Sequence, residues 1–276
     1  MPHIHRMTRP IETISSASNP LIKSLKTLER KKGRNETGLF LAEGARLIGQ
    51  GLANGWKLDS LVVAASMADR PHLSDLIQKA QDHGARVVLA ADKLMSRVTH
   101  KDNAQSVIAA FAQKHLTLAD LPQDKAGLFV ALYEVRDPGN LGTILRTADC
   151  AGISGVILVE TCCDPYSFES VRASMGSIFD MPFAAASFDA FNAWRLSLGL
   201  SMSAASVNGT ARHDHTDFKQ GSVIIMGNEQ SGLTPEAEAA CDQLCLIPMR
   251  GGADSLNLAQ ATAIMTYEAW RQRDFK

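Results

Sequence analysis

In the second half of the chain, short runs that are apolar throughout alternate with stretches of helical periodicity. The apolar runs, which predict strands, are residues 128–135, 155–160, 200–206, 222–229 and 243–249. The helical stretches between them are residues 140–152, 168–179, 188–199 and 235–242, and a closing helix follows residue 257. This alternation predicts a parallel sheet covered on both faces. Ligands bind such sheets beyond the carboxyl ends of the strands, so functional residues are expected just after them.

The first half of the chain alternates in the same way. Residues 18–32 predict a helix, because Leu21, Leu25 and Leu28 have helical spacing after a cap and proline signal. Residues 39–55 predict a strand followed by a helix. Further strands are expected at residues 58–65, 85–90 and 105–112, with a helix at 74–84. The pattern predicts a smaller α/β domain over residues 1–112, a polar linker over 113–126 and a second domain over 127–276.

Composition narrows the class of protein. The 276 residues are 45% hydrophobic and 21% charged, with a net charge of -1, which is typical of a globular domain and gives no overall attraction to nucleic acid. No apolar run approaches the ~20 residues of a membrane helix, and the first residues lack the apolar centre of a secretion signal. We therefore expect a cytoplasmic protein that does not enter a membrane.

Several kinds of site can be set aside. The five cysteines are odd in number and lack paired CxxC spacing, so reduced thiols are expected, and neither a disulfide framework nor a metal site. There is no GxxxxGK phosphate loop. The GxG at residues 49–51 lies inside a helical stretch and not after a strand, so it fails the context of a dinucleotide-binding loop.

The first strand end of interest is followed by a helix entrance at Asp137 and Pro138. Arg146 lies five residues after Leu141, about 140° around the helix, so it is expected to point away from the buried stripe. An ordinary surface arginine is the alternative interpretation. Asn140 in the same stretch could equally be a turn residue.

Two later strand ends resemble the first. Glu229 stands in a loop between glycines just after Gly227, where main chain can approach a ligand closely, although a tight turn with a solvated glutamate has the same pattern. The last strand is followed by a glycine pair and then by Ser255 and Asn257. Asn257 and Gln260 have the spacing of a capping box, so a structural cap is the alternative for Asn257.

Taken in order, residues 140–152, 227–233 and 247–264 resemble the three motifs of the SpoU/TrmH family of the SPOUT superfamily, which are S-adenosylmethionine-dependent RNA methyltransferases. The likeness spans roughly residues 128–270. The first half resembles the ribosomal-protein-L30e-like substrate-binding domain that is often fused in front. The resemblance implies a trefoil-knotted α/β domain whose loops hold the cofactor, and a homodimer with the active site near the interface.

The resemblance also implies which residues act. Arg146 would be the main catalytic residue. A guanidinium stays protonated at any ordinary pH, so we expect it to bind the phosphate beside the target nucleotide. That phosphate or a water would then help take the proton of the 2′-hydroxyl. The other implied catalytic residues, which would orient the reacting groups, are Asn140, Glu229, Ser255 and Asn257. The implied cofactor-binding residues are Gly227, Ile247, Met249, Leu256 and Asn257.

RNA binding is expected from one basic segment. Residues 20–35 carry six basic side chains against Glu29, and such a local charge could engage several phosphates, although a solvated helix end is the alternative. Arg172 lies in a further segment, residues 171–179, that resembles the family, and a packed helix is the alternative there. The predicted RNA-binding residues are Lys23, Lys26, Arg30, Lys31, Lys32, Arg34 and Arg172.

The leading hypothesis is a ribose 2′-O-methyltransferase that acts on ribosomal RNA, with transfer RNA as the alternative substrate. Such an in-line transfer needs no metal. A non-catalytic RNA-binding protein that keeps the knotted fold as a dimer scaffold is the rival, and the joint presence of Asn140, Arg146 and Glu229 counts against it. A nucleotide-dependent dehydrogenase is disfavoured because the glycine fingerprint is missing.

Overall fold

The computed structural model describes residues 11–98 and 106–276. Residues 1–10, on which the expectation of no secretion signal rests, lie outside the described residues. The chain divides into one unit of Met1–Gln113 with Tyr166–Arg172 and a second unit of Lys114–Pro165 with Ala173–Lys276. The segment expected as a linker thus belongs to the second unit, where it forms a short 3-10 helix, Leu118–Asp120.

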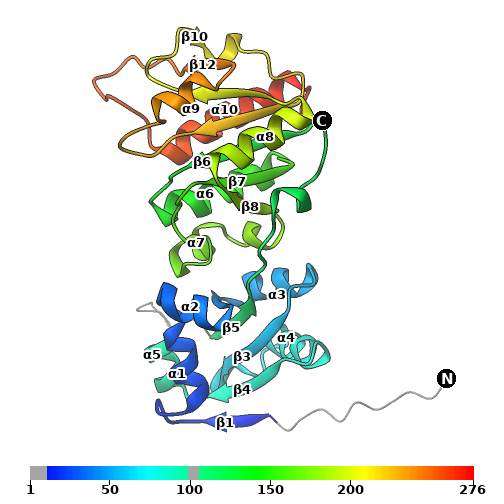
Figure 1. The fold of residues 1–276 in the computed structure, drawn as a ribbon. Coiled ribbons are helices and arrows are strands. Elements are labelled where there is room, and N and C mark those ends of the chain that lie inside the picture. The colour runs from blue at the N-terminus through cyan, green and yellow to red at the C-terminus, as the bar shows by residue number, and fades with distance from the viewer. Residues whose placement is uncertain (1–10, 99–105) are drawn as a thin grey trace, which may run out of the picture. The chain divides into compact units, whose positions relative to one another are not determined.

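The described part of the first unit contains a five-stranded mixed sheet in the order β1-β4-β3-β5-β2 (Figure 1). The strands are β1 Glu12–Ile14, β2 Leu39–Glu43, β3 Leu58–Ala64, β4 Arg86–Ala90 and β5 Val107–Ala112. The helices are α1 Pro20–Thr27, α2 Lys31–Thr37, α3 Ala45–Ala53, α4 Pro71–Asp82 and α5 Asp92–Val98, with a 3-10 turn at Ala65–Met67. The predicted alternation of helices and strands is confirmed. Strand β1 and helix α5 were not predicted from the pattern of apolar and polar positions.

The single helix predicted over residues 18–32 is wrong. Helix α1 ends at Thr27, Arg30 has an extended backbone, and α2 begins at Lys31. Gly33 allows α2 to lie directly against the end of α1, because a Cβ there would stand 2.1 Å from the carbonyl oxygen of Thr27. The continuous helical spacing therefore hides a sharp reversal of the chain.

This reversal also corrects the prediction for Arg34. Its side chain is 3% exposed, and Nη1 donates to the carbonyl oxygens of Leu28 at 2.8 Å and Glu29 at 3.0 Å. These carbonyls end helix α1 and lack intrahelical partners. Arg34 therefore stabilises the helix pair, and we remove it from the residues expected to contact RNA.

The second unit contains, within the described residues, a seven-stranded sheet in the order β10-β12-β9-β11-β6-β7-β8. All six ladders are parallel, which confirms the prediction. The strands are β6 Leu128–Tyr133, β7 Gly155–Val159, β8 Phe183–Ala186, β9 Ser201–Ala205, β10 Ala211–Arg212, β11 Ser222–Met226 and β12 Gln243–Leu246. The helices are α6 Pro138–Cys150, α8 Phe188–Leu198, α9 Pro235–Ala239 and α10 Leu258–Gln272, and a 3-10 turn follows β10 at His213–His215. Helix α7, Phe168–Ala173, belongs to the first unit except for its last residue.

The helix predicted over residues 168–179 is also shorter than expected. It ends at Ala173 because the backbone then enters the left-handed region at Met175 (φ 52°) and Gly176 (φ 112°), and a 3-10 turn follows at Ser177–Phe179. Strands β8 and β10 were not predicted. The two-residue β10 is too short to show any period of two.

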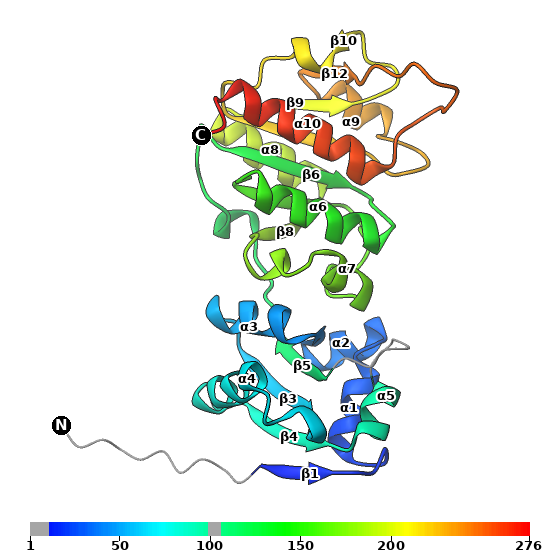
Figure 2. The ribbon, with the colours of Figure 1, turned by 180° about the vertical axis from the view of Figure 1, so that it is seen from behind.

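Helices cover both faces of the second sheet. Figures 1 and 2 show α8 and α9 on one face and α6 and α10 on the other. On the first face Trp194 meets Phe129 of β6 edge to face, with ring centroids 5.1 Å apart. Burial on both faces explains why these strands are apolar throughout. Because the strands are parallel, their carboxyl ends meet along one edge of the sheet.

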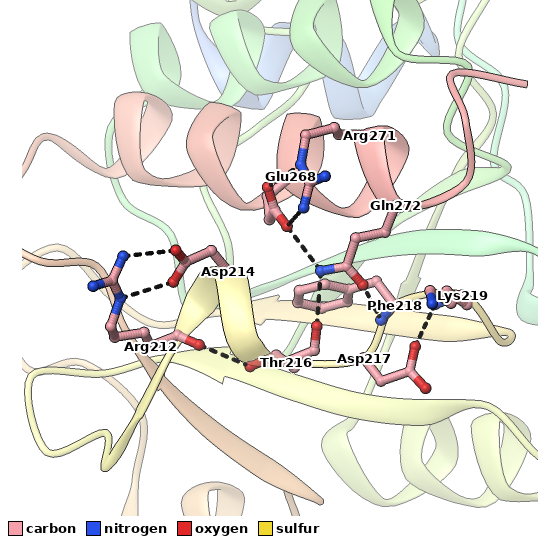
Figure 3. Close-up of polar contacts among 9 residues, drawn as sticks. All are labelled: Arg212, Asp214, Thr216, Asp217, Phe218, Lys219, Glu268, Arg271 and Gln272. Carbon is pink, nitrogen blue, oxygen red and sulfur yellow. Dashed lines mark hydrogen bonds and ion pairs between the residues drawn. The ribbon is translucent and has the colours of Figure 1, made fainter.

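The connection from β10 to β11 is tied to the last turn of α10, and Figure 3 shows this contact. The amide of Gln272 donates to the carbonyl oxygen of Thr216 at 2.9 Å and accepts from the backbone N–H of Phe218 at 3.0 Å. Glu268, one turn earlier, accepts from the same amide at 2.8 Å and pairs with Arg271. The side chain of Gln272 is thereby held in one orientation.

Arg273 completes this C-terminal clamp, a name we use for Gln272 and Arg273. Its guanidinium donates to the carbonyl oxygens of Phe218 at 2.8 Å, Ala126 at 2.7 Å and Gln220. The clamp therefore holds the end of α10 against the residues that precede both β6 and β11. No helix in the described parts of the chain is long and apolar enough to cross a bilayer, and none of the five cysteines is in a disulfide.

We predict that Arg273→Ala lowers the free energy of unfolding by about 1–3 kcal/mol, since it leaves three carbonyl groups without their donor. Urea denaturation of this variant, of a control variant and of the wild type measures the effect. Lys276→Ala is the control, because Lys276 is exposed and its ammonium lies 4.0 Å from the equally exposed carboxylate of Asp274, so its loss should cost less than about 1 kcal/mol. Equal stability of the two variants would contradict the role given to the clamp.

Candidate active site

A cavity of about 920 Å³ lies at the carboxyl edge of the second sheet. Its walls come from the segments that follow β9, β11 and β12 and from the first turns of α6 and α10. The sequence predicted functional residues at these strand ends. Those that line the cavity are Asn140, Gly227, Glu229, Ile247, Met249, Ser255, Leu256 and Asn257. Among the predicted catalytic residues, Arg146 is the one that does not line it.

Gly227 shapes the segment after β11. A Cβ at this position would stand 2.4 Å from the carbonyl carbon of Gly232 and 2.6 Å from the nitrogen of Leu233. Asn228 and Gly232 exchange backbone hydrogen bonds of 3.0 and 2.9 Å, and Gly232 has a left-handed φ of 69°. The backbone that comes close to Gly227 is therefore the chain's own turn, which places Glu229 at its tip.

Glu229 is exposed yet firmly held. Its carboxylate accepts the backbone N–H groups of Arg136 and Asp137 and the side-chain amide of Asn140, each at 3.1 Å. Burial is the largest single influence on its pKa and raises it, but the hydrogen bonds together outweigh burial and lower the pKa of Glu229 below its usual range. These bonds exclude the alternative of a glutamate held only by solvent.

Asn257 has two roles at once. Its Oδ1 accepts the backbone N–H groups of Ala259 at 2.9 Å and Gln260 at 3.3 Å, so it caps α10. Its Nδ2 donates to Oδ1 of Asn140 at 2.9 Å. The structural alternative for Asn257 is thus correct but incomplete, and Asn140 is more than a turn residue.

We call these contacts the Glu229–Asn140–Asn257 chain. An ionised carboxylate only accepts and a backbone N–H only donates, so the two ends of the chain fix the orientation of both amides. The Glu229–Asn140–Asn257 chain joins the loop after β11, the start of α6 and the start of α10. It therefore sets the width of the cavity between three segments that are remote in sequence.

Arg146 and Ser255 stand apart from this chain. Arg146 is exposed, as predicted, and bonds to none of the described residues. It lies six residues, or about 9 Å along the helix axis, beyond Asn140. Ser255 lines the cavity, and its hydroxyl is likewise bonded to none of the described residues. Both side chains can therefore bind a substrate without first breaking an internal contact.

Sequence reasoning missed other residues of the cavity. Ser206 and Asn208 follow β9, so the rule that sites lie after strands would have found them had it been applied to that strand. Glu238 also lines the cavity from the short helix α9, where nothing in the local pattern marks it. Among the described residues, no group of three or more His, Cys, Asp or Glu side chains is placed to hold a metal ion.

The basic residues of the first unit differ in exposure. Lys23 and Lys26 on α1, together with Arg30, are exposed. Lys31 and Lys32 begin α2 and are exposed too, with Lys32 at 3.8 Å from Glu36. Arg172 in α7 is exposed as well. Six of the seven predicted RNA-binding side chains are thus free of the core, and Arg34 is not.

The comparison with known proteins agrees with this geometry. Residues 127–267, half of the chain, match the model of the SpoU rRNA Methylase family. The chain belongs to this family. Residues 19–109 match the MRM3-like substrate binding domain, which confirms that a substrate-binding domain precedes the SpoU domain.

Relatives of this SpoU family chain extend over nearly its whole length. A crystal structure of an AdoMet-bound rRNA methyltransferase from Sinorhizobium meliloti is 41% identical, with a TM-score of 0.88 and coverage of 95% of this chain and 98% of that one. The 23S rRNA (guanosine(2553)-2′-O)-methyltransferase RlmP of Bacillus subtilis is 28% identical over 93% of this chain and 98% of its own. An uncharacterized tRNA/rRNA methyltransferase from Synechocystis is 31% identical over 98% and 97%.

We predict that Gly227→Ala destabilises the SpoU domain by about 1–3 kcal/mol, because the new methyl group overlaps the backbone of Gly232 and Leu233. Thermal unfolding measures the loss. Gly251→Ala is the matched control, since a Cβ there meets nothing within 4 Å. If the two alanine variants unfold at the same temperature, the close approach at Gly227 does not constrain the site.

Proposed function

We propose that this chain transfers a methyl group from S-adenosylmethionine to a ribose 2′-hydroxyl of ribosomal RNA. The observation that carries this function is the cavity bordered by all three family motifs and held by the Glu229–Asn140–Asn257 chain. Two relatives that match about nine tenths of this chain are named as 23S rRNA 2′-O-methyltransferases, which favours ribosomal over transfer RNA.

The residues around the cavity fit the cofactor. About 920 Å³ is ample for a ligand of this size, and main chain at Gly227, Ile247 and Leu256 can offer hydrogen bonds to an adenine. Met249 adds an apolar contact. When bound, S-adenosylmethionine supplies an electrophilic methyl group on a positively charged sulfur.

The chain's own residues then position the acceptor. The 2′-hydroxyl must lie in line with the methyl group and give its proton to the adjacent phosphate or a water, and most of the rate enhancement comes from holding that geometry. We assign the Glu229–Asn140–Asn257 chain and Ser255 to orientation. Arg146 grips the phosphate next to the target in a forked contact, because a guanidinium keeps its proton and cannot serve as the base.

We further propose that two copies form the active unit. Arg146 does not line the cavity of its own chain, and in a pair of copies the guanidinium of one would face the cavity of the other. Helices α6 and α10 lie side by side (Figure 2), and α10 exposes the apolar side chains of Ile264 (36%) and Tyr267 (44%). These exposed apolar side chains, on a helix that packs against the helix of Arg146, suit an interface between copies.

The knot and the cellular site belong to the same proposal. The match of residues 127–267 to the SpoU family supports a threaded chain in this domain. The exposed residues Lys23, Lys26, Arg30 and Lys31 of the substrate-binding domain would contact RNA phosphates. We propose a cytoplasmic location, which a ribosomal substrate would support.

We predict that Arg146→Ala lowers methyl transfer to ribosomal RNA at least about 100-fold, because the acceptor is no longer held in line. The RNA comes from a strain that lacks this protein, and transfer RNA serves as the comparison. Binding of S-adenosylmethionine, measured by calorimetry, should be unchanged. Arg146→Lys keeps the positive charge but cannot make the two parallel hydrogen bonds of a guanidinium. Its rate of methyl transfer should lie between those of the wild type and Arg146→Ala.

Two outcomes contradict this account. If the wild-type protein binds no S-adenosylmethionine, the proposed function is wrong. If Arg146→Ala transfers methyl groups at the wild-type rate, the role of Arg146 is wrong and a non-catalytic use of that arginine remains.

A further inference from the structure

The cavity wall is acidic. Its lining includes the carboxylates of Asp137, Glu229 and Glu238, and no Lys, Arg or His among the described residues. Two of these carboxylates are engaged by N–H groups. Asp137 caps α6 by accepting the backbone N–H of Asn140 at 2.6 Å, and Glu229 accepts three N–H groups. Glu238 is the remaining carboxylate, and it accepts from a hydroxyl and from no N–H group of the described residues.

Glu238 is held in place by one neutral partner. The hydroxyl of Ser206 donates to Oε1 of Glu238 at 2.9 Å, and its other oxygen, Oε2, bonds to none of the described residues. The Ser206 hydroxyl also accepts the backbone N–H of Asn208 at 3.1 Å, so its own proton is left for Glu238. The backbone N–H of Ser206 donates to the carbonyl oxygen of Cys245 at 2.9 Å, which anchors Ser206 and Glu238 to β12.

This arrangement distinguishes the two ligands of a methyl transfer. The sulfonium donor carries one positive charge more than S-adenosylhomocysteine, the thioether product, while the rest of the two molecules is the same. A half-buried carboxylate with a free oxygen at the cavity wall attracts the charged form more strongly than the neutral one. Hydrogen bonds to adenine or ribose would not discriminate in this way, because donor and product share them.

We propose that Glu238, oriented by Ser206, makes the cavity prefer the charged methyl donor over the neutral product. The inference rests on the proposed function and assigns a specificity-determining residue within it. Methyl transfer removes the positive charge on the sulfur, so the reaction itself would weaken the binding of the product.

The test compares Glu238→Gln with Glu236→Gln. Both residues lie on α9 and both changes remove one negative charge, but Glu236 is exposed and does not line the cavity. Calorimetry gives the Kd of S-adenosylmethionine and of S-adenosylhomocysteine for each protein. We expect Glu238→Gln to weaken donor binding about 3- to 10-fold and leave product binding within about twofold, while Glu236→Gln changes neither.

A second variant guards against a folding defect. Ser206→Ala frees the Glu238 side chain and should reduce the preference for the donor in the same direction but by a smaller factor. Thermal unfolding confirms that each variant is folded before its Kd is measured.

Several results would overturn the inference. If Glu238→Gln weakens donor and product equally, Glu238 contacts the adenosine that they share. If Glu238→Gln changes neither Kd, or if Glu236→Gln gives the same change, the carboxylate of Glu238 does not distinguish the charged donor from the neutral product in the cavity. A wild-type protein that binds neither ligand would refute the proposed function itself, which distinguishes the two failures.

Discussion

The Glu229–Asn140–Asn257 chain is the constraint on which the site depends. Its members are separated by 89 and 117 positions in the sequence, yet they hold three loops at fixed spacing. A carboxylate at one end and the free N–H groups of α10 at the other allow only one orientation of the two amides. The cavity has a defined shape because this chain cannot reverse without leaving donors or acceptors unpaired.

The parallel sheet explains how such distant residues meet. With β11 between β9 and β6, the loops after these strands emerge at one edge, and α6 and α10 begin there. Helix α10 is fixed at both ends, by Asn257 at its start and by the C-terminal clamp at its finish. The last helix thus joins the cavity at one edge of the sheet to the residues before β6 at the other. In the proposed function, the acidic wall would face the cofactor and the exposed guanidinium of Arg146 would bind the RNA.

Much of this arrangement could be predicted from the pattern of apolar and polar positions. Asn140, Glu229 and Asn257 stood out because they follow strands, and the family resemblance implied their roles. Their mutual bonds could not be predicted, since these depend on strand order. Composition could not show that Arg34 is buried, because only the close packing allowed by Gly33 brings it to the carbonyls of α1. Glu238 was missed for a similar reason, since its importance comes from the neighbouring Ser206 and not from its own helix.

A double-mutant cycle on Asn140→Ala and Asn257→Ser tests the chain most directly. Serine keeps a capping oxygen for α10 but removes the amide that donates to Asn140, so the cycle isolates the contact between the two side chains. Calorimetric affinity for S-adenosylmethionine is the quantity measured. A coupling of at least about 0.5 kcal/mol between the two substitutions is the result this account predicts. Effects that add to within about 0.3 kcal/mol would contradict it, because the two asparagines would then act independently.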